Sequence, residues 1–329
     1  MRALVYTAPR HVALEDYPRP RPAAGQSEIA IIAAGICGYD ISGFLGESRH
    51  RTPPMVMGHE LVGRRLDGRR VVANPLISCG HCTACLSGAQ NLCADWRLLG
   101  TGMTAGCYAE FVSIPESQIY EIPDDLSDAR AVMAEPLANV VHLFRIAVPL
   151  PFFRLGIVGA GAMGSMALQM AIRLGARETL VQDVSEVRLD TARRMGATLA
   201  VNVSTEEGHA EARRFAGHGL DLVLDACGTA SARQSAFDIC RPGGLAVLLG
   251  MSQTRSEIDF ATSIRKEHRV AMSFGYTPLD FERSLELLKT GEIDLTSWTA
   301  EMPLEQGQQA FNRMSTNPGD TLKMLLRVN

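Results

Sequence analysis

Four cysteines lie within fifteen residues of this 329-residue chain, in the run SCGHCTACLSGAQNLC. Cys79, Cys82, Cys85 and Cys93 follow the spacing C-x2-C-x2-C-x7-C and make up half of the chain's eight cysteines. Thiolates this close together in sequence are typical of a tetrahedral metal site, most often one that holds zinc. Four protein ligands fill the coordination shell of zinc. The cluster therefore predicts a structural site that leaves no position open for a substrate.

Length and composition limit the classes of protein that the rest of the chain can form. With 46% hydrophobic and 21% charged residues, the chain can bury a large core and divide into two domains. The net charge is −4 and the basic residues are scattered, so we expect no nucleic-acid partner. No apolar run approaches the ~18 residues of a membrane span, so we expect no membrane partner. The other four cysteines are dispersed, which favours a reducing, cytoplasmic location: Cys37, Cys107, Cys227 and Cys240.

The chain changes its pattern near Ser127. Before it, short β-like runs alternate with Gly and Pro turns, which predicts a mostly β domain. The N-terminal run 1–16 predicts a first strand. After Ser127, a predicted helix over 127–145 is followed by apolar runs that alternate with amphipathic ones, which indicates an α/β fold with a doubly wound parallel sheet. Its predicted strands are Leu155–Val158, Thr179–Gln182, Leu220–Leu224 and Leu245–Leu249, and its predicted helices are Met163–Leu174, Glu186–Met195 and Ala230–Cys240.

A glycine-rich turn follows the first of these strands directly. The sequence GAGAMG occupies 159–164 and opens a predicted helix, which is the context that a dinucleotide-binding turn requires. Gly159 makes the tight turn, Gly161 lets a pyrophosphate approach the backbone, and Gly164 lets helix and strand pack closely. Met163 lies in the same turn and is a further candidate cofactor residue.

An acidic residue follows this turn at the distance expected of a ribose ligand. Asp183 lies 19 residues after Gly164 and ends the second predicted strand. A carboxylate there accepts hydrogen bonds from ribose hydroxyls and repels a 2′-phosphate, so the sequence favours NAD over NADP. Arg188, five residues further on, either covers the adenosine or lies on an exposed helix face.

A second set of candidate metal ligands is spread over a hundred residues. Cys37 lies in GICGYD, His59 and Glu60 in GHE, and Glu135 in EPLA. All four side chains are competent zinc ligands, and three protein ligands with one open position define a catalytic site. Each also has an ordinary alternative: a small buried thiol, a satisfied core imidazole, or a carboxylate at a turn or a helix start. No spacing rule joins them, so they are candidates only.

The order of these motifs resembles the zinc-dependent medium-chain dehydrogenase/reductase family, which includes the alcohol dehydrogenases. The resemblance covers essentially the full chain, and EPLA at 135–138 resembles the polyol, sorbitol and threonine dehydrogenase branch. It implies a GroES-like catalytic domain, mostly β, over 1–126 and 270–329, which carries both zinc sites. It also implies a Rossmann NAD-binding domain over 127–269.

The resemblance also implies residue roles. Cys37 and His59 match two ligands of a catalytic zinc, and Glu60 matches a carboxylate that is either a ligand or its neighbour. Glu135 matches the third protein ligand of the polyol branch, directly or through water. Asp40 matches a carboxylate that orients the zinc-bound histidine. The four clustered cysteines match a structural-zinc lobe, which makes two zincs per chain.

One position departs from the family pattern. The family usually has Ser or Thr two residues after the catalytic cysteine, where it passes on the substrate proton, but this chain has Tyr39. Ser42 occupies a place where some members have a histidine that ends the relay. Further side chains are candidates for the substrate cleft or for ordinary core and rim positions: Trp96, Met103, Phe274 and Tyr276. By analogy, a homo-oligomer, dimer or tetramer, is expected to form through the sheet edge at 245–251.

The implied reaction is oxidation of a secondary alcohol by hydride transfer from a zinc-bound alkoxide to NAD. The substrate is a small molecule: a polyol, cyclitol, amino sugar or hydroxy-amino acid. A zinc-dependent reductase of ketones or aldehydes that uses NADPH is the alternative on the same site. A zinc-free reductase of this fold would lack both ligand sets, and a zinc-ribbon module fused to a nucleotide sensor would leave the second set unexplained.

Overall fold

The structure, a computed structural model, describes residues 1–102 and 104–328, and it contains two compact units. The first unit comprises Met1–Ala138 and Gly275–Asn329, and the second comprises Asn139–Phe274. Met103, a candidate cleft residue, lies outside the described residues. Over the described ranges, no helix combines the length and the apolar character that a membrane crossing requires.

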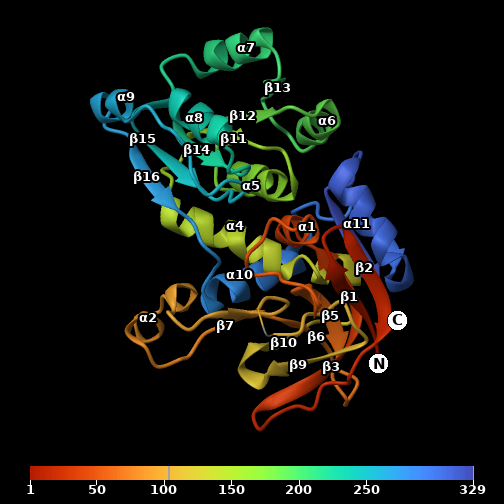
Figure 1. The fold of residues 1–329 in the computed structure, drawn as a ribbon. Helices are drawn as coiled ribbons and strands as arrows, with labels where there is room; N and C mark the ends of the chain where they lie inside the picture. The colour runs from red at the N-terminus through yellow and green to blue at the C-terminus, as the bar shows by residue number, and fades with distance from the viewer. Residues whose placement is uncertain (103, 329) are drawn as a thin grey trace. The chain divides into compact units, whose positions relative to one another are not determined.

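A seven-stranded sheet forms the centre of the first unit (Figure 1). Strand β18, near the C-terminus, lies antiparallel to β3, with Met324 opposite Ile36. On the other side of β3 lies β5, where Glu60 is opposite Gly35. Segments from both ends of the chain therefore meet beside Cys37. The strands are β3 (Gln26–Ile36), β5 (Glu60–Arg64), β6 (Arg70–Ala73), β9 (Phe111–Pro115), β10 (Ile119–Glu121), β17 (Thr299–Pro303) and β18 (Lys323–Arg327).

The N-terminal run forms two strands, so the prediction of a single strand was wrong. Strands β1 (Arg2–Ala8) and β2 (His11–Asp16) form an antiparallel hairpin, and β4 (Met55–Val56) pairs with β1. Arg10 in the connecting turn has a φ of 64°, a conformation that ends an extended strand. The alternating pattern continues on both sides of this turn, which is why it reads as one strand.

Aromatic side chains pack together where two helices of the first unit meet. Helix α1 (Gly38–Phe44) and helix α11 (Gly307–Thr316) meet through Phe44 and Phe311, whose ring centroids are 5.0 Å apart. Tyr108 packs edge-on against Phe311 at 5.8 Å and is completely buried. Such pairs stabilise a core beyond the area that they bury. They fix the position of Tyr108, whose hydroxyl reaches the candidate site.

The second unit is built on a six-stranded sheet in the order β13-β12-β11-β14-β15-β16, and every pairing in it is parallel. This confirms the predicted α/β fold with a doubly wound parallel sheet. The strand order reverses at β11, and ligands bind at the carboxyl ends of strands at such a point. The strands are β11 (Arg154–Val158), β12 (Glu178–Asp183), β13 (Leu199–Asn202), β14 (Leu220–Asp225), β15 (Cys240–Leu248) and β16 (Arg269–Met272).

The edge of this sheet differs from the prediction. Strand β15 pairs with β14 on one side and β16 on the other, so the predicted edge at 245–251 is wrong. The edge strand on this side of the sheet is β16, and β13 lies at the opposite edge. The helices between the strands agree with the predicted ones to within two residues at each end: α5 (Ala162–Arg173), α6 (Glu186–Arg194) and α8 (Ala230–Asp238), with α7 (Glu206–Ala216) and α9 (Phe260–Arg265) added.

The helix predicted over 127–145 is interrupted. Ser127 caps a short helix α3 (Asp128–Ala131), as predicted, because its hydroxyl accepts a hydrogen bond from the Arg130 amide. Helix α4 (Ala134–Ala147) then begins anew. Pro136 has no N–H to donate to the carbonyl four residues earlier, so one continuous helix cannot form here. The interruption places Glu135 in the first turn of α4.

Candidate functional site

Three of the predicted catalytic ligands come together in the first unit. Cys37 follows β3 and precedes α1, while His59 directly precedes β5 and Glu60 begins it. One ligand atom from each side chain, the Cys37 Sγ, a His59 ring nitrogen and a Glu60 carboxylate oxygen, lies within 4.8 Å of the other two. Cys37 is half-buried, and the other two are buried. The antiparallel register of β3 and β5 brings these segments together.

Two glycines make room for this arrangement. A Cβ atom on Gly35 would lie 2.0 Å from a Glu60 carboxylate oxygen, so no larger residue fits opposite Glu60. Gly58 has a φ of 99°, and a Cβ there would lie 2.6 Å from the Tyr108 ring. The glycine in GHE is therefore required both by its backbone conformation and by the space available.

Glu60 forms a buried ion pair that the sequence did not predict. The Lys323 Nζ on β18 donates to both Glu60 oxygens, at 2.6 and 2.8 Å, and the two side chains are 4% and 0% exposed. Burial alone would lower the pKa of Lys323, but the Glu60 carboxylate, together with the charges on Cys37 and Glu135, outweighs burial and raises that pKa. The available sequence signal was a lone lysine in the apolar run LKMLLRV.

Glu135 adds a second buried carboxyl group. Its carboxylate is not part of the group of three ligand atoms that lie within 4.8 Å of one another. The pKa of Glu135 is raised, mainly by burial and further by the Glu60 charge, although the His59 charge lowers it. Tyr276 is completely buried nearby, and burial together with the Glu135 charge raises its pKa well above the usual value. Of the predicted cleft residues, Tyr276 therefore lies beside the candidate ligands. Trp96 instead lines a groove beside the clustered cysteines.

Asp40 is held mainly by two residues that sequence reasoning missed. The Arg51 Nε and Nη2 donate to its Oδ1 at 2.9 and 2.6 Å, and the Tyr108 hydroxyl donates to its Oδ2 at 2.8 Å. The predicted partner, His59, has its Nδ1 3.7 Å from Oδ2, beyond hydrogen-bond range. Burial alone would raise the pKa of Asp40, but the Arg51 and His59 charges, together with the hydrogen bonds from Tyr108 and Arg51, outweigh burial and lower it.

Arg51 also positions the residue that departs from the family pattern. Its side chain is completely buried, and its guanidinium lies 4.2 Å from the centre of the Tyr39 ring. A cation over an aromatic face is an attractive arrangement that is strengthened by burial. Tyr39 is thereby fixed at the first turn of α1, on which Ser42 is also half-buried.

The electrostatics of this site suit a bound cation. Burial alone would lower the pKa of His59, but the Asp40 carboxylate and Cys37 outweigh burial and raise it to about 10. The buried His59 Nδ1 has no hydrogen-bond partner among the described residues. A site that attracts a proton this strongly will also attract a divalent metal, and one thiol, one imidazole and one carboxylate are all zinc ligands. The residues present therefore fit a zinc ion.

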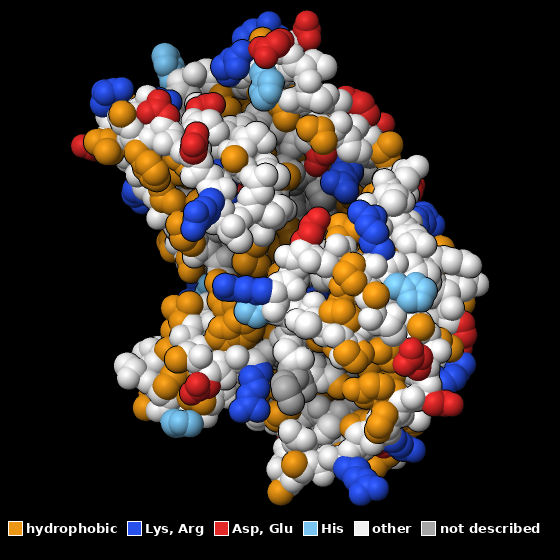
Figure 2. Space-filling model, viewed as in Figure 1, with side chains coloured by type: hydrophobic (Ala, Val, Ile, Leu, Met, Phe, Trp, Pro, Cys, Tyr) orange, Lys and Arg blue, Asp and Glu red, His pale blue; other side chains and the backbone are white. Residues whose placement is uncertain are grey.

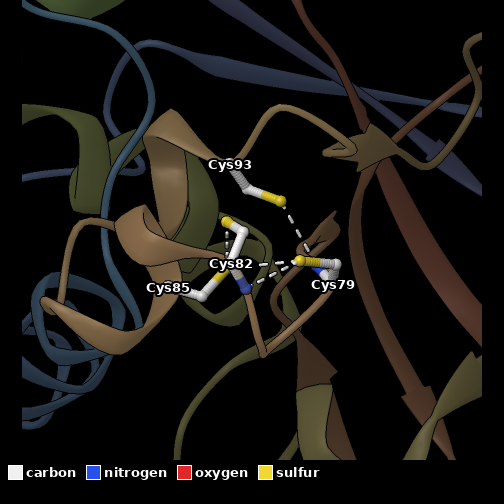
Figure 3. Close-up of side chains that lie close together, drawn as sticks. All are labelled: Cys79, Cys82, Cys85 and Cys93. Carbon is white, nitrogen blue, oxygen red and sulfur yellow. Dashed lines mark hydrogen bonds between the residues drawn. The ribbon is translucent and has the colours of Figure 1, made fainter.

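The four clustered cysteines form a separate lobe (Figure 3). Their sulfur atoms all lie within 4.8 Å of one another, on a loop around the short helix α2 (Thr83–Leu86). The Cys79 amide donates to the Cys93 sulfur and the Cys82 amide to the Cys79 sulfur, each at 3.4 Å. The Cys85 backbone N–H lowers the pKa of Cys82 to about 6. Four sulfur atoms this close together, two of which accept hydrogen bonds from backbone amides, are suitable ligands for a zinc ion.

We expect Cys82→Ser to remove one zinc per chain and to lower the free energy of unfolding by about 3 kcal/mol or more, because a structural zinc stabilises the fold that surrounds it. Elemental analysis and urea unfolding measure both effects. Cys240→Ser, a buried cysteine outside either ligand set, should keep the full zinc content. A Cys82→Ser protein with undiminished zinc would contradict the assignment.

The glycine-rich turn in the second unit has the geometry of a nucleotide site. Gly159 has a φ of 107°, and a Cβ there would lie 2.5 Å from the Cys227 sulfur. A Cβ on Gly164 would lie 1.9 Å from the Gly159 carbonyl oxygen, whereas nothing lies within 4 Å of one on Gly161. Gly161 is the N-cap of α5, so a pyrophosphate could approach the helix N-terminus there. Met163 follows, half-buried, in the first turn.

Asp183 is held against this turn by backbone amides. Its Oδ2 accepts from the Ala160 amide at 2.7 Å, and its Oδ1 accepts from the Val184 and Ser185 amides at 2.8 and 2.9 Å. The Arg188 Nη1 lies 4.0 Å from Oδ2. All six predicted cofactor residues are therefore gathered at the carboxyl ends of β11 and β12.

Comparisons with known proteins identify the family of this chain. The family profile described as an alcohol dehydrogenase GroES-like domain matches residues 23–124, and the profile described as a zinc-binding dehydrogenase matches residues 162–290. Sorbitol dehydrogenase of Bacillus subtilis is 29% identical, with 100% of this chain and 98% of the relative covered. L-threonine 3-dehydrogenase of Shewanella baltica is 32% identical, with 97% of each covered.

Solved structures are similar over the whole chain. An Escherichia coli alcohol dehydrogenase complexed with NADH has a TM-score of 0.91 at 25% identity and covers 100% of this chain and 99% of its own. A zinc-binding dehydrogenase of Sinorhizobium meliloti bound to NADP has a TM-score of 0.90 at 26% identity and covers 99% of each. This chain therefore belongs to the zinc-dependent medium-chain dehydrogenases, in the branch of the polyol and threonine dehydrogenases. Its cofactors are zinc and a nicotinamide nucleotide.

Proposed function

We propose that this dehydrogenase oxidises a secondary alcohol to a ketone, with NAD as the hydride acceptor. The substrate class is a polyol, cyclitol, amino sugar or hydroxy-amino acid, in line with the sorbitol and threonine dehydrogenases that it is similar to. The observation that carries the proposal is the group of half-buried Cys37 and buried His59 and Glu60, whose ligand atoms lie within 4.8 Å of one another. The catalytic domain is assigned to the first unit and the cofactor domain to the second.

Cys37, His59 and Glu60 would hold the catalytic zinc, with Glu135 as the second carboxylate beside it. Zinc lowers the pKa of an oxygen that it binds, which favours loss of the hydroxyl proton. Lys323 neutralises one of the two carboxylates, so the site does not accumulate excess negative charge. Tyr39, whose ring lies against the Arg51 guanidinium, is the residue that we propose relays the proton in place of the usual Ser or Thr: its hydroxyl accepts that proton and passes its own on to water.

The preference for NAD rests on Asp183. Three backbone amides hold its carboxylate at the end of β12, where its charge opposes a 2′-phosphate. Arg188, 37% exposed and close to that carboxylate, supports the alternative: a ketone or aldehyde reductase that uses NADPH. The two functions differ in the cofactor and not in the zinc site.

We also propose that the protein forms a homodimer through β16. This edge strand exposes Val270 and Met272, and the neighbouring helix α9 exposes Phe260 and Ile264. Figure 2 shows hydrophobic side chains gathered along the part of the surface where Figure 1 draws β16. Pairing with a second copy would satisfy the open edge and cover this apolar surface.

A screen of purified protein against polyols, cyclitols, amino sugars and hydroxy-amino acids, with NAD and with NADP, tests the proposal. We expect two zincs per chain by elemental analysis and reduction of NAD at least about tenfold faster than that of NADP, since one repulsive contact is worth more than ~1.4 kcal/mol. Faster reaction of ketones with NADPH would favour the alternative. Zinc-replete protein that is inactive with the whole panel would contradict the substrate class.

A further inference from the structure

The loop that follows β15 is held mainly by hydrogen bonds from residues outside it. We call residues 249–256 the β15 loop; it leads from β15 towards α9. All five residues at 251–255 are exposed, so buried side chains do not anchor this part of the loop. A segment of this kind opens at little cost unless hydrogen bonds hold its backbone. Arg233 donates three such bonds to the β15 loop.

Arg233 reaches the β15 loop from helix α8, which packs beside β14 and β15 (Figure 1). Its Nη2 donates to the Gly250 and Gln253 carbonyls at 3.2 and 2.8 Å, and its Nη1 donates to the Ser256 Oγ at 2.6 Å. Its Nε lies 3.8 Å from the Oδ2 of Asp225, which is completely buried. A planar guanidinium can hold several acceptors at fixed angles. Arg233 therefore joins the loop to the carboxyl end of β14.

Asp225, the last residue of β14, organises the two loops that follow β14 and β15. Its Oδ1 accepts from the Cys227 and Gly228 amides at 2.9 and 2.8 Å. Its main-chain carbonyl accepts from the amides of the first two residues after β15, each at 3.0 Å. Its Oδ2 accepts no hydrogen bond from the residues that the structure describes. The Arg233 guanidinium is the cation that faces this oxygen.

The same two loops lie directly beside the glycine-rich turn. The Cys227 sulfur occupies the place where a Cβ atom on Gly159 would clash, at 2.5 Å. A Cβ atom on Gly250 would lie 2.1 Å from the Gly228 nitrogen, and the Gln253 amide donates to the Gly228 carbonyl at 2.9 Å. The β15 loop therefore contacts, backbone to backbone, the loop that packs against the glycine-rich turn.

The position of these loops on the sheet corresponds to one half of a dinucleotide. Strand β12, which ends at Asp183, and strand β14 lie on opposite sides of β11. A dinucleotide binds across the point where the strand order reverses. With its adenosine ribose at Asp183 and its pyrophosphate at the glycine-rich turn, its nicotinamide half would extend over the loops after β14 and β15.

We propose that Arg233 is a positioning residue for the nicotinamide half of the cofactor: it keeps the β15 loop in the conformation that this half binds. The inference rests on the cofactor placement proposed above. Without the three hydrogen bonds the loop would be ordered in only a fraction of the molecules, and the affinity for NAD would fall by that fraction. The adenosine half would be unaffected, because separate backbone amides hold Asp183.

Calorimetry with NAD and with 5′-AMP, which has only the adenosine half, tests the proposal. We expect Arg233→Met to bind NAD at least about tenfold more weakly, as when about one loop in ten is ordered, and 5′-AMP within about twofold of wild type. Arg233→Lys keeps a cation beside Asp225 but lacks the planar fork, so it should bind NAD about threefold more weakly. If Arg233→Met does not fold, the lysine variant decides the question.

Arg154 provides the matched control, because it makes a similar set of bonds at the amino end of β11. Its guanidinium donates to the carbonyls of Phe215, Ala216 and Gly219 and to the Glu178 carboxylate. Arg154→Met should therefore lower the free energy of unfolding in urea, as Arg233→Met does. It should leave NAD affinity within about twofold of wild type, since its loop lies at the opposite end of the strands from the glycine-rich turn.

Three results would overturn the proposal and leave the proposed function intact. They are wild-type NAD affinity in the Arg233 variants, equal weakening of NAD and 5′-AMP binding in these variants, and an equal loss of NAD affinity in Arg154→Met. Wild-type protein that binds neither NAD nor NADP would overturn the proposed function together with this inference.

Discussion

His59→Ala is expected to reduce alcohol oxidation by at least about a thousandfold and to leave NAD affinity within about twofold. The variant loses one ligand from the Cys37 and Glu60 group, and zinc supplies several kcal/mol of charge stabilisation in reactions of this kind. NAD affinity should persist because all six candidate cofactor residues belong to the second unit. Steady-state kinetics, elemental analysis and calorimetry with NAD measure the three quantities.

His218→Ala is the matched control for this prediction, because His218 is exposed in the second unit and near neither ligand set. It should keep both zincs and full activity. If His59→Ala keeps two zincs per chain, His59 is not a ligand. If it loses NAD binding as well, the effect is on folding and not on the metal centre.

Lys323→Met is expected to lower the free energy of unfolding by about 3–5 kcal/mol, because it leaves the Glu60 carboxylate buried without its counter-ion. Methionine keeps most of the side-chain volume, so packing changes little. The exposed pair of Lys289 and Glu286 on helix α10 (Pro278–Thr290) provides the control. Lys289→Met should cost less than about 1 kcal/mol, as exposed ion pairs do.

The double variant Glu60→Gln/Lys323→Met tests whether the unpaired Glu60 charge causes the loss of stability in Lys323→Met. Without the charge on Glu60 the penalty for its burial falls, so the double variant should be more stable than Lys323→Met alone. Urea unfolding at constant zinc concentration measures all four proteins. Equal losses for Lys323→Met and Lys289→Met would show that the buried pair does not contribute in this way.

Much of the second unit could be predicted because its signals are local. Apolar runs predicted β11, β12 and β14 to within about two residues, and the glycine turn identified its own place between β11 and α5. The edge of the sheet could not be predicted in this way. Which strand lies outermost depends on pairing between distant segments, and no local pattern in β16 reveals it.

In the candidate metal centre, too, some residues could be predicted from the sequence and others could not. The motif order predicted Cys37, His59 and Glu60, and the register of β3 and β5 brings them together. Lys323 and Arg51 were missed, because no local pattern links a lysine to a carboxylate 263 residues away. Their only signal was a charged residue where an apolar one was expected.

The pairing of β18 with β3 has a consequence for how the chain folds. Residues 139–274 form a contiguous unit that can become compact as soon as it has left the ribosome. The first unit cannot, because half of one β3 edge and the counter-ion of Glu60 come from β18. During synthesis, β3 therefore keeps an open edge until about 290 further residues have been added and β18 is complete. We expect the metal centre to be the last part of the protein to mature, and the nascent chain to depend on chaperones until it does.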